Sequence, residues 1–318
     1  MSKIIDAHSH CIYPEYLDMV AKNNALLEDG FPLPADWSAE QQLELMEKGG
    51  IEWTMVSLSS PQPYFGDVEE SKKMCRFINE QLADAKRRYP DKLGFGACLP
   101  LPDVDAAIEE AIYALDVLGA DSIKLASNSR GQYLGDPALE PLFEELNKRG
   151  AIVNIHPHRP EPQQEGIFSA GPVPVFEFIC DTTRAVLNMI ANGVIERYEN
   201  VTVIVPHNGS FLPNICDRMK MVASVLVPKG LMQPVDVDAS FKKLWFDTSG
   251  NPVPTLLKFL LTVADPSHVM YGADFPFTPM PLVLKNLAAL EEYLDNEPEI
   301  GKYKDMILYD NAKTLFKR

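Results

Sequence analysis

The sequence has few cysteines, and their spacing matches no known stabilising arrangement of cysteines. The five cysteines are odd in number and include no Cys-x-x-Cys pair, which excludes a disulfide framework and a structural zinc site of cysteine type. No run of about 18 apolar residues is present, and the N-terminus lacks a basic segment followed by an apolar one. We therefore expect neither export nor membrane spanning, and a cytoplasmic protein with reduced thiols.

Basic residues are also scarce. The chain has 29 Lys and Arg against 45 Asp and Glu, a formal net charge of -16. A negative field of this size opposes nucleic acids and anionic membranes as partners. It also repels small anions, so a carboxylate substrate would need a local arginine or a metal ion to hold it.

The remaining composition is that of an ordinary globular protein, with 46% hydrophobic and 23% charged residues and no internal repeat. A chain of 318 residues is long for an average domain, but α/β barrels often reach this length as one unit. We therefore predict a single domain that spans residues 1–318.

Short β-rich segments alternate with helical segments along the whole chain. The predicted strands are 3–10, 53–58, 93–98, 122–126, 151–155, 201–205, 244–247 and 269–271. Eight β/α units favour a (β/α)8 barrel of the triosephosphate isomerase (TIM) type, with short inserted loops and closing C-terminal helices. An open, doubly wound sheet is the structural alternative.

Helix signals support this alternation, and two stretches lack them. Ser38 to Gln41 forms a capping box that predicts a helix ending at Gly49-Gly50. The stretch between the first strand and Ser38 is predicted to be irregular. Residues 156–174 contain five prolines and no periodicity, so we predict a binding loop or lid there.

Histidines and one aspartate fall at the ends of the predicted strands. His8 and His10 lie two residues apart on the first strand, so both imidazoles face one side. His156 and His207 end the fifth and sixth strands, and Asp274 follows the eighth. Because barrel enzymes build their sites at the carboxyl ends of the strands, these groups predict a metal site with an open position for substrate. Zinc is the first candidate, and the mixed nitrogen and oxygen donors also admit manganese or iron.

Three further residues carry weaker signals. His158 lies in the predicted loop and is a candidate substrate contact, or else a solvated side chain. Lys124, near the end of the fourth strand, either packs its stem on the barrel wall or is carbamylated and bridges a second metal. His268 begins the eighth strand, at the opposite end of the barrel, and is predicted to be structural.

Four segments together resemble a known family across nearly the whole chain. They are Asp6-Ala7-His8-Ser9-His10, Ile155-His156-Pro157, Pro206-His207-Asn208-Gly209 and Gly272-Ala273-Asp274-Phe275-Pro276. Their order and spacing resemble the amidohydrolase superfamily, and more closely its branch of non-oxidative decarboxylases that act on aminocarboxymuconate semialdehyde, resorcylate and methylsalicylate.

The resemblance implies roles for individual residues. It implies one divalent metal ion held by His8, His10, His156 and Asp274, with His207 as a proton-transfer residue. It also implies a homodimer in which Arg218 binds the substrate carboxylate in a neighbouring subunit's site. The alternative for Arg218 is a surface arginine on a helix, paired with Asp217 or another acid. The chain departs from the resorcylate enzymes at Ser210, where they have a glutamate that supports the histidine.

The implied function is decarboxylation of a small hydroxyaromatic or enoic carboxylic acid. Hydrolysis or hydration of a lactone, an amide or an unsaturated diacid is the alternative, because the same ligands support both chemistries. A catalytically silent metal-binding protein is the alternative from a different class. An extra histidine and an arginine beside an open coordination site are more than metal storage needs.

Overall fold

The computed structural model describes residues 3–34, 37–163, 166 and 171–318. Eight parallel strands form one sheet in the order β1-β2-β3-β4-β7-β8-β9-β10. Their bounds are β1 Ile4–Cys11, β2 Ile51–Leu58, β3 Leu93–Cys98, β4 Ser122–Ala126, β7 Ile152–His156, β8 Thr202–Val205, β9 Trp245–Asp247 and β10 Val269–Met270. The order follows the sequence without the reversal that a doubly wound sheet requires. The predicted (β/α)8 barrel is confirmed, and all eight predicted strands are present.

The segment that follows β10 returns to β1 and closes the barrel. The Ala7 amide donates a hydrogen bond to the Tyr271 carbonyl (2.9 Å), and the His10 amide donates to the Phe275 carbonyl (2.7 Å). Ser9 and Phe275 also form an isolated parallel bridge. This closure brings the Gly272-to-Pro276 segment directly against the strand that carries His8 and His10.

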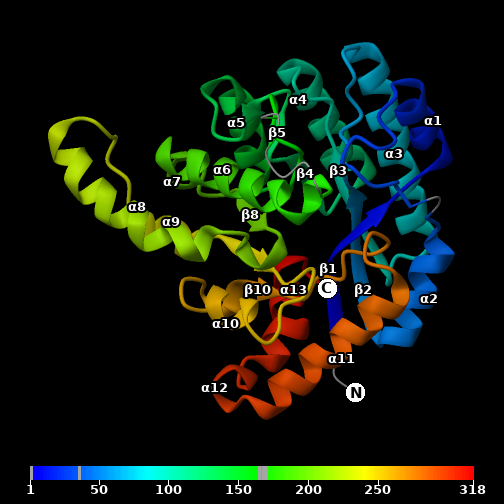
Figure 1. Ribbon diagram of the computed structural model, residues 1–318. Helices are drawn as coiled ribbons and strands as arrows, with labels where there is room; N and C mark the ends of the chain where they lie inside the picture. The colour runs from blue at the N-terminus through cyan, green and yellow to red at the C-terminus, as the bar shows by residue number, and fades with distance from the viewer. Residues whose placement is uncertain (1–2, 35–36, 164–165, 167–170) are drawn as a thin grey trace.

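Helices surround the strands (Figure 1). They are α1 Pro14–Lys22, α2 Ala39–Gly49, α3 Val68–Arg88, α4 Val104–Tyr113, α5 Glu140–Arg149, α6 Glu177–Ala191, α7 Val194–Arg197, α8 Leu212–Leu226, α9 Val237–Lys243, α10 Leu256–Leu260, α11 Met280–Asn296, α12 Pro298–Gly301 and α13 Asn311–Leu315. The predicted capping box opens α2, with Ser38 Oγ accepting from the Gln41 amide, and Gly50 ends the helix at φ +66°. Local sequence therefore sets both ends of this helix.

One prediction about the helices was wrong. The stretch after β1 is not irregular throughout, because Pro14 opens α1 and Tyr16, Met19 and Val20 bury one face of it. The structure also adds a short antiparallel pair, β5 Asn128–Ser129 with β6 Gln132–Tyr133.

The predicted C-terminal helices are present, and α13 lies against the barrel (Figure 1). Ala312 and Phe316 pack with the buried residues Ile5, Ala7 and Met55 in one apolar cluster. The ring of Phe316 lies 5.1 Å from that of Trp53. This cluster fills the barrel near the amino ends of its strands, and the polar residues of interest lie at the carboxyl ends.

The described part of the predicted 156–174 loop packs over the barrel, with the Val173 amide donating to the Asp29 carbonyl at 2.9 Å. Residues 164–165 and 167–170 of this prediction lie outside the described residues. Helices α8 and α9 extend away from the barrel (Figure 1). Among the helices of the described chain, none combines the length and apolar character needed to cross a bilayer.

Candidate active site

Five predicted polar side chains, two from β1 and three from the ends of other strands, meet at the carboxyl rim of the barrel. His8 Nε2 and His10 Nε2 lie 2.9 Å apart. Asp274 Oδ1 lies 3.1 Å from His10 Nε2 and 3.7 Å from His8 Nε2. The ligand-type atoms of His8, His10 and His156 all lie within 4.8 Å of one another, as do those of His8, His207 and Asp274. Barrel closure thus converges residues that are up to 266 positions apart in the sequence.

Hydrogen bonds fix the orientation of three of these imidazoles. The Nδ1 atom of His8 faces Asp247 Oδ2 at 2.8 Å, that of His10 faces the Ser57 carbonyl at 3.2 Å, and that of His156 faces the Pro157 carbonyl at 2.8 Å. An acceptor beside each Nδ1 assigns a proton to that nitrogen, so Nε2 is the atom left to bind a metal when the ring is neutral. The Nε2 atoms of His8, His10 and His156 and the carboxylate of Asp274, which lies 3.1 Å from His10 Nε2, together make a nitrogen and oxygen donor set that suits a divalent metal.

Asp247, at the end of β9, is a site residue that the sequence analysis missed. It is buried, and its Oδ1 accepts from the His207 amide (3.1 Å) and from Ser249 Oγ (2.6 Å), while its Oδ2 faces His8. The available signal was an aspartate at the last position of a predicted strand, the same signal that identified His156. Asp247 therefore orients the His8 ring and anchors the loop that carries His207.

The electrostatics of the site favour a cation at its centre. Burial lowers the pKa of His10 to about 4 and that of His156 well below its usual value, so both imidazoles are neutral. At His8, burial also lowers the pKa, but the carboxylates of Asp247 and Asp274 outweigh it and raise the value to about 9. Although burial opposes ionisation of Asp274, the neighbouring histidines hold the pKa of this carboxyl well below its usual range. A divalent ion would supply the positive charge that these carboxylates demand.

Backbone geometry at the end of the barrel places Asp274. Its φ of +57° is in the left-handed region, and its amide donates to the His8 carbonyl at 2.7 Å. A Cβ atom at Gly272 would lie 2.9 Å from the His8 Cβ, so only glycine lets this segment approach β1 so closely. Asp6 accepts from the Ala273 amide at 2.9 Å, which gives the first aspartate of the Asp-x-His-x-His segment a positioning role.

His207 lies at the edge of the cluster, with Nε2 3.9 Å from Asp274 Oδ2. Its backbone is held by Asp247 and Ser249, but its Nδ1 is buried and has no hydrogen-bond partner among the described residues. Ser210 Oγ is likewise buried and without a partner in that part of the chain. The serine that replaces the expected glutamate therefore does not support the His207 ring.

A cavity of about 180 Å³ opens beside the cluster. Its walls are Asp29, Phe31, Ser59, Ser60, His156, Pro174, Phe178, Ile179, His207, Asp274 and Phe277. The volume is about six times the ~30 Å³ that a water molecule occupies in the liquid, which suits a small single-ring acid. Phe31, Phe178 and Phe277 supply an apolar wall, and the lining includes no Lys or Arg of the described chain. A carboxylate in this cavity therefore depends on a metal ion or on a cation from elsewhere.

His158 and Arg218 lie away from this cavity. His158 is buried, with Nδ1 3.0 Å from the Arg159 carbonyl, and it lines a separate, smaller cavity beside Glu28 and Arg130. Arg218 is exposed on α8, and within the described chain no carboxylate forms an ion pair with it, since Asp217 lies near Lys220 instead. The substrate contacts predicted for both residues stay predictions.

Lys124 and His268 have clear local environments. Lys124 is buried inside the barrel, its Nζ donates to the Ser59 carbonyl at 3.0 Å, and burial lowers its pKa to about 8. This bond holds the end of β2, and Ser59 Oγ in turn lies 3.1 Å from His156 Nε2. His268 stacks on Trp245 with ring centroids 4.4 Å apart, away from the cluster.

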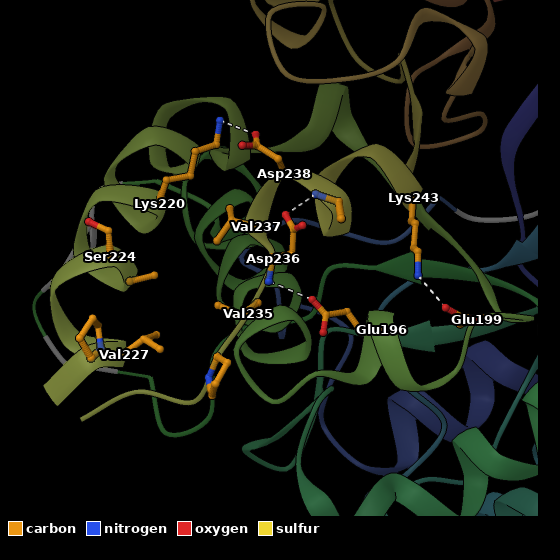
Figure 2. Close-up of a pocket in the computed structure, with 14 residues that line it drawn as sticks. Glu196, Glu199, Lys220, Ser224, Val227, Val235, Asp236, Val237, Asp238 and Lys243 are labelled. Carbon is orange, nitrogen blue, oxygen red and sulfur yellow. Dashed lines mark hydrogen bonds and ion pairs between the residues drawn. The ribbon is translucent and has the colours of Figure 1, made fainter. Parts of the chain in front are cut away.

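A larger cavity, of about 810 Å³, lies between α7, α8 and α9 (Figure 2). Its charged side chains have partners: Lys220 lies 2.6 Å from Asp238 and Lys243 lies 3.4 Å from Glu199, while Glu196 accepts from the Asp236 backbone amide at 3.0 Å. None of the clustered histidines lines it. The smaller cavity at the rim is therefore the candidate active site.

The chain is similar in sequence and in fold to known decarboxylases. The chain is 34% identical to decarboxylase yanB of Aspergillus niger, over 99% of this chain and 87% of that protein. It is 31% identical to 6-methylsalicylic acid decarboxylase of Penicillium expansum, over 91% of this chain and 90% of that protein. The crystal structure of 5-carboxyvanillate decarboxylase from Novosphingobium aromaticivorans, complexed with manganese and a hydroxybenzoic acid, superposes with a TM-score of 0.85 at 22% identity, over 100% of this chain and 96% of that one.

The profile of the family described as "Amidohydrolase" matches residues 5–318, which include every residue of the histidine and aspartate cluster. The two curated relatives cover at least nine-tenths of this chain. The protein therefore belongs to the amidohydrolase family, in the branch that contains these decarboxylases.

Proposed function

We propose that this protein is a divalent-metal-dependent decarboxylase of a small hydroxyaromatic or enoic carboxylic acid. The observation that carries the proposal is a ring-sized cavity, lined by aromatic side chains, that opens onto His156, His207 and Asp274. The relatives named above are decarboxylases, and two of them are named for aromatic acids, 6-methylsalicylic acid and 5-carboxyvanillate; they support the reaction class. The partner of the site is thus a small-molecule carboxylate, and the net charge of -16 argues against nucleic acid or an anionic membrane.

We infer that His8, His10, His156 and Asp274 hold one metal ion. When bound, the ion would chelate the substrate carboxylate and the adjacent hydroxyl group and screen their negative charge. Zinc was the first candidate from sequence, but the mixed imidazole and carboxylate donors also suit manganese, the ion in 5-carboxyvanillate decarboxylase. We therefore propose manganese first and zinc second.

Side chains of the protein carry out the proton transfer. His207 lines the cavity beside the cluster, so we assign it delivery of a proton to the ring carbon that bears the carboxylate. The carbon–carbon bond then breaks, its electron pair returns to the ring, and carbon dioxide leaves. Asp274 is ionised and lies 3.9 Å from His207. Its negative charge stabilises the imidazolium form of His207 until His207 transfers its proton to the substrate. Solvent afterwards restores the proton on His207.

Hydrolysis or hydration would use the same residues to activate water, and the ligands do not distinguish the two chemistries. The relatives favour decarboxylation. The test is carbon dioxide release from a panel of 2-hydroxybenzoates, set against ring opening of lactones and hydration of unsaturated diacids, with protein of measured metal content. Turnover confined to lactones or diacids would reject the proposal, and so would the absence of any turnover by fully loaded protein, which would favour a silent metal-binding role.

We further propose a cytoplasmic homodimer in which Arg218 completes the partner's site. The absence of Lys or Arg from the described cavity lining leaves the substrate carboxylate without a counter-charge from its own chain. Arg218 is exposed on the projecting helix α8, which also exposes the apolar side chains of Met221 (55%) and Val225 (46%). A second copy seated on this helix would cover these side chains and bring the cation to a site that lacks one. The free thiols of all five cysteines fit a reducing compartment.

A further inference from the structure

Asp29, which the sequence analysis did not select, is a buried carboxylate in the wall of the active-site cavity. It lies in the segment between α1 and α2, and its residue is only 4% exposed. It lines the same cavity as His156, His207 and Asp274. The backbone fixes it there, because its carbonyl accepts from the Val173 amide at 2.9 Å and a Cβ at the next residue, Gly30, would lie 3.0 Å from Pro172.

The two oxygens of Asp29 have different surroundings. Oδ2 accepts a hydrogen bond from Ser60 Oγ at 2.9 Å. Oδ1 is buried and has no hydrogen-bond partner among the described residues. A buried carboxylate oxygen without a donor is costly, and such groups in native proteins are satisfied by a bound molecule or an ordered water. Because Asp29 lines the active-site cavity, a molecule bound in that cavity is the candidate donor.

The charge of Asp29 decides which part of a substrate it can face. The remaining charged group in the cavity lining is Asp274, at the proposed metal site. The substrate carboxylate therefore belongs beside the metal ligands, and Asp29 would repel it. A neutral hydrogen-bond donor is the group that Asp29 accepts. The raised pKa of this carboxyl, about 6 and caused first by burial, agrees with a desolvated acceptor.

Building on the proposed function, we propose that Asp29 is a specificity residue that accepts a hydrogen bond from a second hydroxyl or amino group on the substrate ring, away from the carboxylate and its adjacent hydroxyl. The substrate class is thereby narrowed to ring acids that carry this additional donor. Such a site rejects analogues that lack the donor, because binding them leaves Asp29 Oδ1 without a partner.

Equilibrium binding tests this inference without requiring turnover. The probes are pairs of phenols, each a dihydroxybenzene and the methylphenol in which the second hydroxyl is replaced by a methyl group, titrated calorimetrically into metal-loaded protein. We expect at least one dihydroxybenzene isomer to bind about tenfold or more tightly than its methyl partner. In Asp29→Leu, which removes the acceptor at similar volume, this ratio should fall to about one or reverse.

Two further variants keep the test decisive. Asp29→Asn retains the shape and should reduce the ratio partially even if the leucine variant does not fold. Glu28→Gln is the matched control: Glu28 is the adjacent carboxylate, it pairs with Arg159 at 2.7 Å and lies outside the cavity lining, so the ratio should be that of the wild type. Equal binding of both members of every pair by the wild type, or an unchanged ratio in both Asp29 variants, would overturn the inference. Because binding is measured apart from carbon dioxide release, a missing decarboxylase activity would count against the proposed function and not against the role of Asp29.

Discussion

His8 Nδ1 lies 2.8 Å from Asp247 Oδ2, and both side chains are buried. These residues come from β1 and β9, at almost opposite ends of the sequence. A carboxylate in this position holds the ring in one orientation, keeps the proton on Nδ1 and makes Nε2 a stronger donor to a metal. Asp247 is thus a positioning residue of the proposed metal site, since it contacts His8 and is not itself a proposed ligand.

Asp247→Asn should weaken metal binding by about 10–100-fold, because the neutral amide no longer increases the basicity of His8. Competition with a chelator of known affinity measures this effect. Asp265→Asn is the control, since Asp265 caps an exposed turn at Ser267. Equal metal affinity in the Asp247 variant and the wild type would show that this contact does not tune the site.

Removal of a ligand should differ from removal of the proton-transfer residue. His8→Ala, His156→Ala and Asp274→Ala should each lose both bound metal and activity. His207→Ala should retain most of the metal and lose about 10²–10⁴-fold in kcat. Elemental analysis together with carbon dioxide release separates these outcomes, and His268→Ala, which alters the stack on Trp245, serves as a control. A metal-free His207→Ala protein would instead place His207 among the ligands, as its distance to Asp274 also permits.

Arg218 should act on the neighbouring subunit. Arg218→Ala and His207→Ala proteins should each be nearly inactive alone. When subunits exchange, each mixed dimer has one site with both groups intact, so activity should recover toward half of the wild-type value per dimer. Light scattering checks the dimer. Demonstrated exchange without recovered activity would remove the trans role of Arg218.

Asp29 should lower the stability of the protein as the pH rises. Its pKa is raised from 3.8 to about 6 in the folded state, so folding favours the protonated form. Its contribution is fully present below about pH 4 and is lost as the pH passes through about 6. A pKa raised by about two units corresponds to about 3 kcal/mol over the whole titration. Part of this is already lost at pH 4.5, so Asp29→Asn should gain about 2 kcal/mol relative to the wild type between pH 4.5 and 8.

Urea unfolding of metal-free protein at the two pH values measures this gain. Asp295→Asn, at an exposed partner of Lys304, should follow the wild-type pH dependence. The same relative stability of Asp29→Asn at both pH values would contradict the raised pKa. A variant that is more stable and less discriminating would show that this carboxylate is kept for binding at a cost in stability.

The sequence alone was sufficient for the barrel and for the positions of His8, His10, His156, His207 and Asp274 on its rim. These predictions depend on local properties: the two-residue periodicity of a strand, helix caps such as Ser38, and the rule that parallel strands end on one face. Each can be recognised within a short window of sequence.

The partners of these residues were decided by the tertiary structure. Asp247 and Asp29 were not found because an aspartate at a strand end or in a loop is common, and only closure of the barrel places Asp247 against a residue 239 positions away. His158 lies in a loop as predicted, but its side chain is buried and the solvated alternative is wrong, because contacts with distant segments cover it. Local sequence determines secondary structure and the facing of side chains, whereas the hydrogen bonds that set protonation, orientation and substrate choice form between segments that meet only when the chain is folded.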